Sequence, residues 1–262
     1  MFALATLVFA ACSDDHAISD GNSDVVTDPS GDAWVALNIK TPAAVTRGLN
    51  TPNQENAITG EYEIEDVKAI FFDGDQDASL VTKVIDLSTG SGDLTSSGAS
   101  SSSKAFQIPA TSKTILIIAN PGAGFSSVGE GSSFVDVNKA VKDESITTSV
   151  AKTGTFLMTN SKGHLEPSDN SGNTINLTLY KSQDVAVKNP LAIYIDRVVA
   201  KVRVYTSDGA MDNSTASIYS PKWILNVTNK WYYPVSRRIK TWNEDPANTP
   251  DARGTCVTPF DS

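Results

Sequence analysis

The stretch that decides the fold lies near the N-terminus and reads Ala33-Trp34-Val35-Ala36-Leu37-Asn38-Ile39. Its apolar side chains follow the two-residue period of a β-strand and not the longer period of a helix. Val35, Leu37 and Ile39 therefore share one face, and Trp34, Ala36 and Asn38 share the other. The stretch predicts a first strand with one buried face.

Similar stretches recur along the chain, and strong helix formers are outweighed by Ser, Thr, Val, Ile and Asn. Further strands are predicted at residues 64–72, 80–87, 105–108, 114–119, 156–158 and 175–180. Residues 133–143 carry apolar side chains at helical spacing and predict one short helix. The segment 88–104 is rich in Ser and Gly, and we expect it to be a loop. The predicted fold class is all-β.

A second unit is expected to begin near Gln183. Residues 191–205 form a long apolar, β-branched stretch, and two more strands are predicted at 222–227 and 231–235. The predicted division is an N-terminal β-sandwich domain at 34–182 and a C-terminal β domain at 183–262. Three strands do not complete a sandwich, because a small sheet needs a packing partner. The C-terminal domain is therefore expected to be truncated.

Residues 1–11 form an uncharged apolar run that ends in small residues directly before Cys12. About 20 apolar residues are needed to span a bilayer as a helix, so this run is too short for a stable anchor. It has the length of the apolar part of a signal peptide. The segment resembles the signal peptide of a bacterial lipoprotein, with Cys12 as the acylated residue. The alternative is a buried helix of the folded domain.

Residues 12–33 are predicted to be a flexible acidic tether between the lipid and the folded domain. From Ser13 to Asp32 there is no Lys or Arg, and there are too few apolar side chains to offset the entropy of ordering. The run also resembles the surface-export signal of Bacteroidetes lipoproteins, although any hydrophilic spacer is an alternative. If Cys12 is acylated, Cys256 has no partner, so the fold is not expected to depend on a disulfide.

Residues that carry catalytic chemistry are scarce. The chain has two histidines, His16 and His164, and it lacks the nucleophile-elbow, Walker A, Rossmann and zinc-protease motifs. We therefore expect neither an enzyme nor a bound cofactor. The net charge of −9 argues against nucleic acid or an anionic membrane surface as a partner.

Asp73, Asp75 and Asp77 imitate the start of a calcium-binding loop. An EF-hand loop also needs Gly at its sixth position and Glu at its twelfth, where this chain has Ala78 and Val84. A solvated turn between two strands is the better interpretation, with weak calcium binding as the alternative, so no metal site is predicted.

Four short stretches carry a family resemblance when they are taken in order. They are Ile-Ala-Asn-Pro at 118–121, Phe-Leu-Met-Thr-Asn at 156–160, Ile-Asp-Arg-Val-Val-Ala-Lys-Val-Arg-Val at 195–204 and Trp-Ile-Leu-Asn-Val-Thr-Asn at 223–229. Together they resemble the fimbrillin family of the Bacteroidetes, the type V pilins that include major and minor fimbrial subunits. The resemblance implies two tandem transthyretin-like β-sandwich domains, the second incomplete here, and assembly by strand exchange.

The resemblance also implies a lipoprotein precursor that an Arg-specific protease cuts in the loop after the first strand. Arg47 is the only Arg before residue 197, and its segment is small-residue-rich and Pro-flanked, so we expect it to be exposed. Cleavage between Arg47 and Gly48 would remove the lipid, the tether and the first strand. An unpaired sheet edge would remain, which is a template for strand addition. An ordinary loop arginine is the alternative.

The expected function is a structural subunit of a cell-surface fimbria, exported as an outer-membrane lipoprotein and supporting adhesion to a ligand that the sequence does not identify. Its expected partners are other fimbrial subunits. Two alternatives stay open: an anchor or accessory subunit that keeps its lipid, and a surface lipoprotein that binds glycans through Trp223 and Trp231. In the family the polymerising strand comes from the C-terminal end. This chain stops at Ser262, so we expect either a fragment or a variant subunit.

Overall fold

The computed structural model describes residues 24–41, 61–122, 125–139, 151–152, 155–160, 165, 167–168 and 174–198. Their strands are β1 (Asp32–Val35), β2 (Leu37–Lys40), β3 (Asp66–Phe72), β4 (Val81–Ser88), β5 (Leu94–Ser97), β6 (Ser100–Ser103), β7 (Phe106–Pro109), β8 (Thr114–Ala119), β9 (Ala151–Lys152), β10 (Thr155–Phe156), β11 (Met158–Thr159), β12 (Leu191–Tyr194) and β13 (Asp196–Arg197). Their helices are α1 (Phe134–Lys139) and α2 (Gln183–Lys188). Within these ranges the strands form a five-stranded sheet, β13-β11-β8-β3-β4, a four-stranded sheet, β12-β2-β6-β5, and the pairs β1-β7 and β10-β9.

In the structure the first strand covers residues 32–40 and consists of β1 followed by β2. Val35 faces Phe106 in the β1–β7 pair, and Asn38 faces Ser102 in the β2–β6 pair. Between these two facing pairs, the β6–β7 side has one residue more than the first strand, which is the count of a β-bulge. The bulge lies opposite Ala36 and divides the strand into its two halves.

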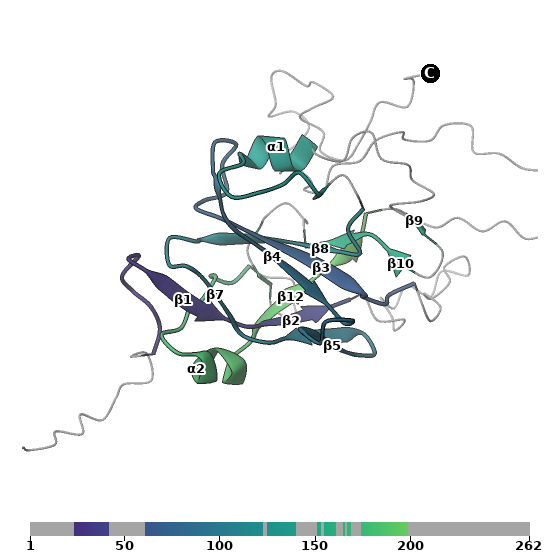
Figure 1. Ribbon diagram of the computed structural model, residues 1–262, viewed down its shortest axis with the longest axis horizontal. Helices are drawn as coiled ribbons and strands as arrows, with labels where there is room; N and C mark the ends of the chain where they lie inside the picture. The colour runs from purple at the N-terminus through teal and green to yellow at the C-terminus, as the bar shows by residue number, and fades with distance from the viewer. Residues whose placement is uncertain are drawn as a thin grey trace, which may run out of the picture.

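The main core fills the space between the two larger sheets. The five-stranded sheet contributes Phe71 and Ile117 to it, and the first strand and β12 contribute Leu37, Ile39 and Ile193 from the opposite side. In Figure 1, β3, β4 and β8 cross above β1, β2, β7 and β12. Alternate residues of each strand point into this space, as in a β-sandwich.

The five-stranded sheet is buried on its other face too. There Leu116 and Ile118 pack with Phe134 and Val137 of α1 in a second core, and α1 lies above this sheet in Figure 1. The rings of Phe72 and Phe134 meet edge to face, with centroids 5.6 Å apart. Burial on both faces explains why β8 is a nearly unbroken apolar run and not an alternating one.

The all-β prediction is confirmed for the described residues, which are mostly strands in packed sheets. β3, β4 and β8 correspond to the strands predicted at 64–72, 80–87 and 114–119, and α1 lies within the helix predicted at 133–143. The tandem arrangement of two domains stays a prediction, because residues 199–262 lie outside the described part.

The prediction of a loop at residues 88–104 is wrong. The segment contains the β5–β6 hairpin, which turns at Gly98 with a φ of 59°, a conformation that favours glycine. β6 pairs with a strand on each side, and Leu94 and Ser101 of the hairpin are buried. Serine is a weak strand former, so pairing and burial override the local composition here.

Part of the predicted tether at 12–33 is bonded into the fold. Val26 N–H donates to the Leu179 carbonyl oxygen, and Lys181 N–H donates to the Asp24 carbonyl oxygen, both at 2.9 Å. Val26 also packs against the main core. The chain therefore joins the sheets before the first strand begins.

The start of the predicted C-terminal domain, at 183–262, is likewise bonded to the sheets of the preceding residues. β12 pairs with β2 over four positions, from Leu191 opposite Leu37 to Tyr194 opposite Lys40. β13 pairs with β11 in the five-stranded sheet. The described sheets thus include the chain up to Arg197.

Asn160 ties the end of β11 to its neighbour β8. The side chain is buried, its Oδ1 accepts from Ile117 N–H at 2.8 Å, and its Nδ2 donates to the Ile115 carbonyl oxygen at 2.9 Å. The amide thus takes the place of a backbone peptide and satisfies two polar groups inside the protein.

We predict that Asn160→Ala lowers the free energy of unfolding by about 2–4 kcal/mol, because it leaves a buried N–H and a buried carbonyl without partners. Urea denaturation followed by tryptophan fluorescence measures the change. Asn176→Ala is the control, because Asn176 is exposed, and it should stay within about 0.5 kcal/mol of the wild type. Equal stability of the two variants would contradict the assignment.

Candidate functional site

The first strand lies inside a sheet, and this position makes it the candidate functional element. β2 lies between β6 on one side and β12 on the other. β1 lies between β7 and the backbone at Tyr180. Both edges of the strand are hydrogen-bonded, so it can leave only by exposing unpaired backbone on two neighbours.

The two neighbours of β2 run in opposite directions. β6 is antiparallel to β2, and β12 is parallel to it. On the parallel side, Leu191 N–H donates to the Ala36 carbonyl oxygen at 2.8 Å, and Ile195 N–H donates to the Lys40 carbonyl oxygen at 3.0 Å.

α2 links the two segments that line the edge of the first strand opposite β6 and β7: the segment at Tyr180, which pairs antiparallel with Trp34, and the parallel strand β12. Tyr180 exchanges two backbone hydrogen bonds with Trp34, of 2.7 and 2.8 Å. Burial raises the pKa of the Tyr180 hydroxyl above its ordinary value. The chain then turns back through α2, which begins at the N-cap Ser182, where the hydroxyl accepts from Val185 N–H. One stretch, 180–194, thus borders both halves of the first strand.

The inner face of the first strand carries the three side chains that the sequence indicated. Val35, Leu37 and Ile39 are each 0% exposed and belong to the main core. At about 1.5–3 kcal/mol for each buried side chain, they contribute about 4.5–9 kcal/mol together. A whole domain is commonly stable by about 5–15 kcal/mol, so the fold depends strongly on this strand.

The first strand also meets serine hydroxyls of β6. Ser100 Oγ donates to Asn38 Oδ1 at 2.7 Å and accepts from Lys40 Nζ at 3.1 Å. Ser103 Oγ accepts from Leu37 N–H at 2.9 Å, next to the bulge. Side chains of β6 therefore add to the backbone ladder that holds the strand.

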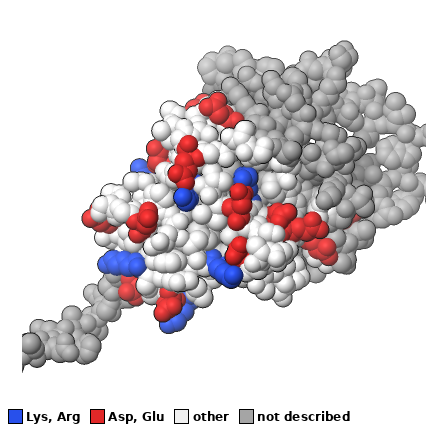
Figure 2. Space-filling model, in the orientation of Figure 1, with Lys and Arg blue, Asp and Glu red and all other residues white. Residues whose placement is uncertain are grey.

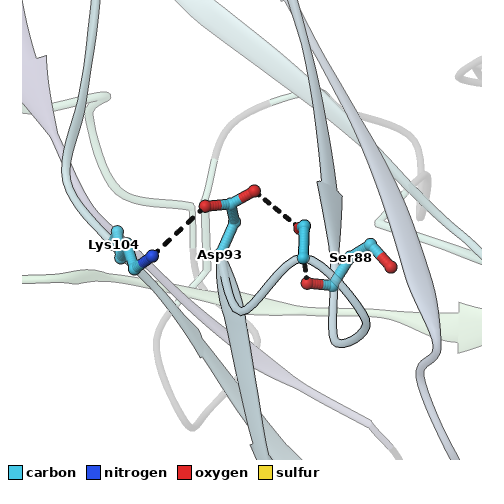
Figure 3. A network of polar contacts seen from close by, with 4 residues as sticks. Ser88, Asp93 and Lys104 are labelled. Carbon is cyan, nitrogen blue, oxygen red and sulfur yellow. Dashed lines mark hydrogen bonds and ion pairs between the residues drawn. The ribbon is translucent and has the colours of Figure 1, made fainter.

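Asp93 holds the base of the β5–β6 hairpin (Figure 3). Its carboxylate accepts from the Ser91 hydroxyl at 2.6 Å and lies 3.4 Å from Lys104 Nζ. The hydrogen bonds from Ser91 and then from Lys104 hold the pKa of Asp93 below its ordinary value. The Ser91 hydroxyl oxygen also lies 3.0 Å from the Ser88 carbonyl oxygen, so its single hydrogen is shared between the two acceptors. None of these groups belongs to the first strand, and all of them lie between Ser88, at the end of β4, and Lys104, directly after the hairpin.

The two residues that flank the segment 42–60 are both fixed. Thr41 is buried and donates to the Ala99 carbonyl oxygen through its N–H at 3.0 Å and its hydroxyl at 3.2 Å. Glu61 lies 3.6 Å from Arg197, whose guanidinium lies 5.6 Å from the centroid of the Phe156 ring. Thr41 is thus bound to the hairpin, whereas Glu61 is bound to the five-stranded sheet.

Asn120 fixes the residues that follow Glu61. Its φ of 54° lies in the left-handed region, which asparagine tolerates better than most residues. Its Oδ1 accepts from Glu65 N–H at 2.9 Å, and its Nδ2 donates to the carbonyl oxygens of Glu63 at 2.8 Å and Phe156 at 2.9 Å. This segment is therefore held by groups that do not belong to the first strand.

The predicted lipidation and cleavage residues, Cys12, Arg47 and Gly48, lie outside the described residues, as do Trp223 and Trp231. Their roles stay predictions. The structure therefore describes the strand that is proposed to leave, and the two ends of the segment that carries the proposed cut.

The aspartates at 73–77 lie in the turn between β3 and β4. Asp73 Oδ1 accepts from Leu80 N–H at 2.8 Å, which closes the turn. Within the described ranges, no three His, Cys, Asp or Glu residues come together in a way that could hold a metal ion. In the same ranges, no helix has the length and apolar character needed to cross a membrane.

Charged side chains are mixed on the face of the molecule drawn in Figure 2, where acidic and basic groups lie close together. Ion pairs among the described residues include Lys68–Asp86, Lys83–Glu130 and Lys104–Asp93. The hydrogen bond from Lys83 to Glu130 raises the pKa of that lysine. Exposed pairs of this kind add little to stability, so they shape the surface more than the fold.

Sequence reasoning identified the inner face of the first strand and missed the groups that hold its edges. Ser100 and Ser103 fell in the segment predicted to be a loop, and Thr41 and Asn120 had no predicted role. One signal was available: Gly98 stands between two short runs that contain no charge and no proline, which is compatible with a hairpin.

Known proteins identify the family. The family model for the major fimbrial subunit protein (FimA) matches residues 35–194, which is more than half of the chain. No curated protein matched the chain.

Two solved structures from Parabacteroides distasonis are similar to parts of the chain. One is a fimbrial assembly protein, with 12% identity, a TM-score of 0.34 and coverage of 63% of this chain and 53% of that one. The other is a candidate cell adhesion protein, with 16% identity, a TM-score of 0.35 and coverage of 63% and 46%. The chain thus matches about half the length of these proteins. With the family model matched from the first strand to the end of β12, the fimbrillin resemblance is confirmed, and the chain belongs to the family of the major fimbrial subunit protein.

Proposed function

We propose that this protein is a structural subunit of a cell-surface fimbria, and that it assembles by exchanging its first strand for a strand of a neighbouring subunit. The observation that carries the proposal is the internal position of the first strand, between β6 and β12, in a chain of the fimbrial subunit family. This is a family of structural proteins and not of enzymes.

The precursor is exported with residues 1–11 as its signal peptide and is held at the outer membrane by a lipid on Cys12. The acidic composition that follows Cys12 supports a spacer between the lipid and the fold. The spacer ends by residue 24, because Asp24 and Val26 are bonded to the segment at Leu179.

An Arg-specific protease then cuts between Arg47 and Gly48. Contacts on the two sides of the cut have opposite effects: one set must break before the first strand departs, and the other keeps the rest of the chain in place. Thr41 is bound to the hairpin, whereas Glu61 is bound to Arg197, and Glu63 and Glu65 are bound to Asn120. After the cut, the first strand has no covalent link to the rest of the fold, and the new N-terminal side keeps its attachment.

Departure of the first strand opens a groove with two unpaired walls, one formed by β6 and β7 and the other by β12 and the backbone at Tyr180. The places of Val35, Leu37 and Ile39 become apolar sockets worth about 1.5–3 kcal/mol each. An extended segment of another subunit can fill the sockets and restore both ladders, which is the donor-strand mode of binding. Other fimbrial subunits are the partners, and the resulting fibre supports adhesion.

We predict that Arg47→Ala prevents assembly. The wild-type chain, treated with an Arg-specific protease, should lose its N-terminal fragment and form a high-mass ladder in unheated gels. The variant should stay monomeric because its first strand remains covalently attached. Arg47→Lys is the matched control: it should resist the Arg-specific protease and assemble after treatment with a protease that accepts lysine. A high-mass ladder formed by Arg47→Ala would contradict the proposed cleavage. Persistent acylation of the wild type would favour an anchor subunit that keeps its lipid.

A reversible lock tests the departure of the strand itself. Asn38 and Ser102 face each other across β2 and β6, so their Cβ atoms are about 4.5–5.5 Å apart, close to the separation that a disulfide needs. We predict that Asn38→Cys with Ser102→Cys, in a background where Cys12 and Cys256 are serine, prevents formation of the high-mass gel ladder after cleavage under oxidising conditions. A reducing agent should restore it.

The matched control for this lock is a second cross-link that spares the first strand. Lys68 and Asp86 face each other across β3 and β4, so Lys68→Cys with Asp86→Cys should assemble in both redox states. If the locked first strand still permits a ladder while oxidised, assembly does not require that strand to leave.

A further inference from the structure

We propose that Ser100 and Ser103 of β6 read the strand that enters the groove, and that they select a strand with a side-chain acceptor at the position of Asn38. This inference rests on the proposed strand exchange and adds a specificity that the apolar sockets do not provide. Apolar sockets accept many strands of alternating pattern, whereas a directed hydrogen bond discriminates between them.

The hydroxyl of Ser100 is used twice by the resident strand. It donates to Asn38 Oδ1 at 2.7 Å and accepts from Lys40 Nζ at 3.1 Å. Both partners belong to the strand that is proposed to leave, so departure frees the donor and the acceptor together. An incoming strand with an apolar side chain in place of Asn38 would cover the Ser100 hydroxyl without offering it a partner, which is unfavourable.

Ser103 contacts the backbone of the first strand and not one of its side chains. Its Oγ accepts from Leu37 N–H at 2.9 Å, at the bulge where the β1–β7 and β2–β6 registers differ by one residue. A side-chain acceptor at this point holds one N–H of the incoming strand in register. Ser103 therefore demands a free N–H, which excludes proline at the position of Leu37.

The two other serines of β6 are not positioned for this role. Ser101 faces the interior and shares a hydrogen bond of 2.9 Å with Ser96 of β5, which stays within the hairpin. Ser102 is exposed and faces Asn38 across the ladder. Ser102 is thus a matched control of the same residue type on the same strand.

The predicted incoming strand has a defined chemistry. It carries large apolar residues at the positions of Leu37 and Ile39, Asn or Asp between them, and a hydrogen-bond donor at the position of Lys40. A strand that presents leucine between the two apolar positions fills the sockets equally well and lacks the acceptor.

The test uses the full chain with a site-specific protease sequence in place of residues 44–50. After cleavage, the chain is incubated with an excess of a fluorescent synthetic peptide of residues 31–41, and binding is followed by polarisation. Ser100→Ala should weaken binding about fivefold or more, because it removes the hydrogen bonds to Asn38 and Lys40, and Ser102→Ala should leave it unchanged. The peptide with Asn38→Leu should bind the wild type more weakly, and Ser100→Ala should then weaken its binding less than it weakens binding of the unchanged peptide, because the bond to Asn38 is already absent.

A second measurement needs neither cleavage nor assembly. In the intact chain, Ser103→Ala should accelerate hydrogen exchange at the Leu37 amide by about fivefold or more in NMR spectra, and Ser102→Ala should not. Equal behaviour of Ser100→Ala and Ser102→Ala, tight binding of the Asn38→Leu peptide, or no peptide binding at all would each overturn the inference. Serine-dependent peptide binding without a ladder would support the inference and reject the proposed assembly. A high-mass ladder that forms equally well with Ser100→Ala and Ser103→Ala would support the proposed assembly and reject the inference.

Discussion

Hydrogen bonding along both edges of the first strand is the constraint on which the rest of the structure depends. A strand at a sheet edge can detach at the expense of one ladder, but this strand completes two. Its inner face also supplies part of the main core, so edge pairing and burial reinforce each other. In the proposed exchange, departure of the strand would leave unpaired backbone on two neighbours and an exposed part of the core, and an incoming strand would restore both.

Under the proposed strand exchange, the second core would let the subunit lose a strand and keep its shape. The residues of this core come from the outer face of the five-stranded sheet, from α1 and from neighbouring loops, and none belongs to the first strand. The sheet therefore stays covered on that face whatever occupies the groove. The segment held by Asn120 is an attachment that is also independent of the first strand.

The sequence predicted the parts of the fold in which the pattern of apolar residues itself indicates which side chains are buried. The alternation at Val35, Leu37 and Ile39 indicated one buried face, and the run at 114–119 indicated a strand. Composition failed at 88–104, because serines become strand residues there only through pairing with β2 and β5, which are distant or unrecognised in the sequence. The sequence did not indicate the roles of Ser100 and Asn120 for a related reason: both side chains bond to partners about 60 residues away in the chain.

The opposite directions of β6 and β12 give the groove a polarity of its own. Reversing the inserted strand would make it parallel to β6 and antiparallel to β12, so neither wall would keep the hydrogen-bond pattern that it has with the resident strand. In the proposed exchange, subunits would repeat head to tail, and a head-to-tail contact that does not close on itself produces a filament. Such a filament would have unlike ends, one with an empty groove and one with an unused strand, and growth and termination there would be chemically different events.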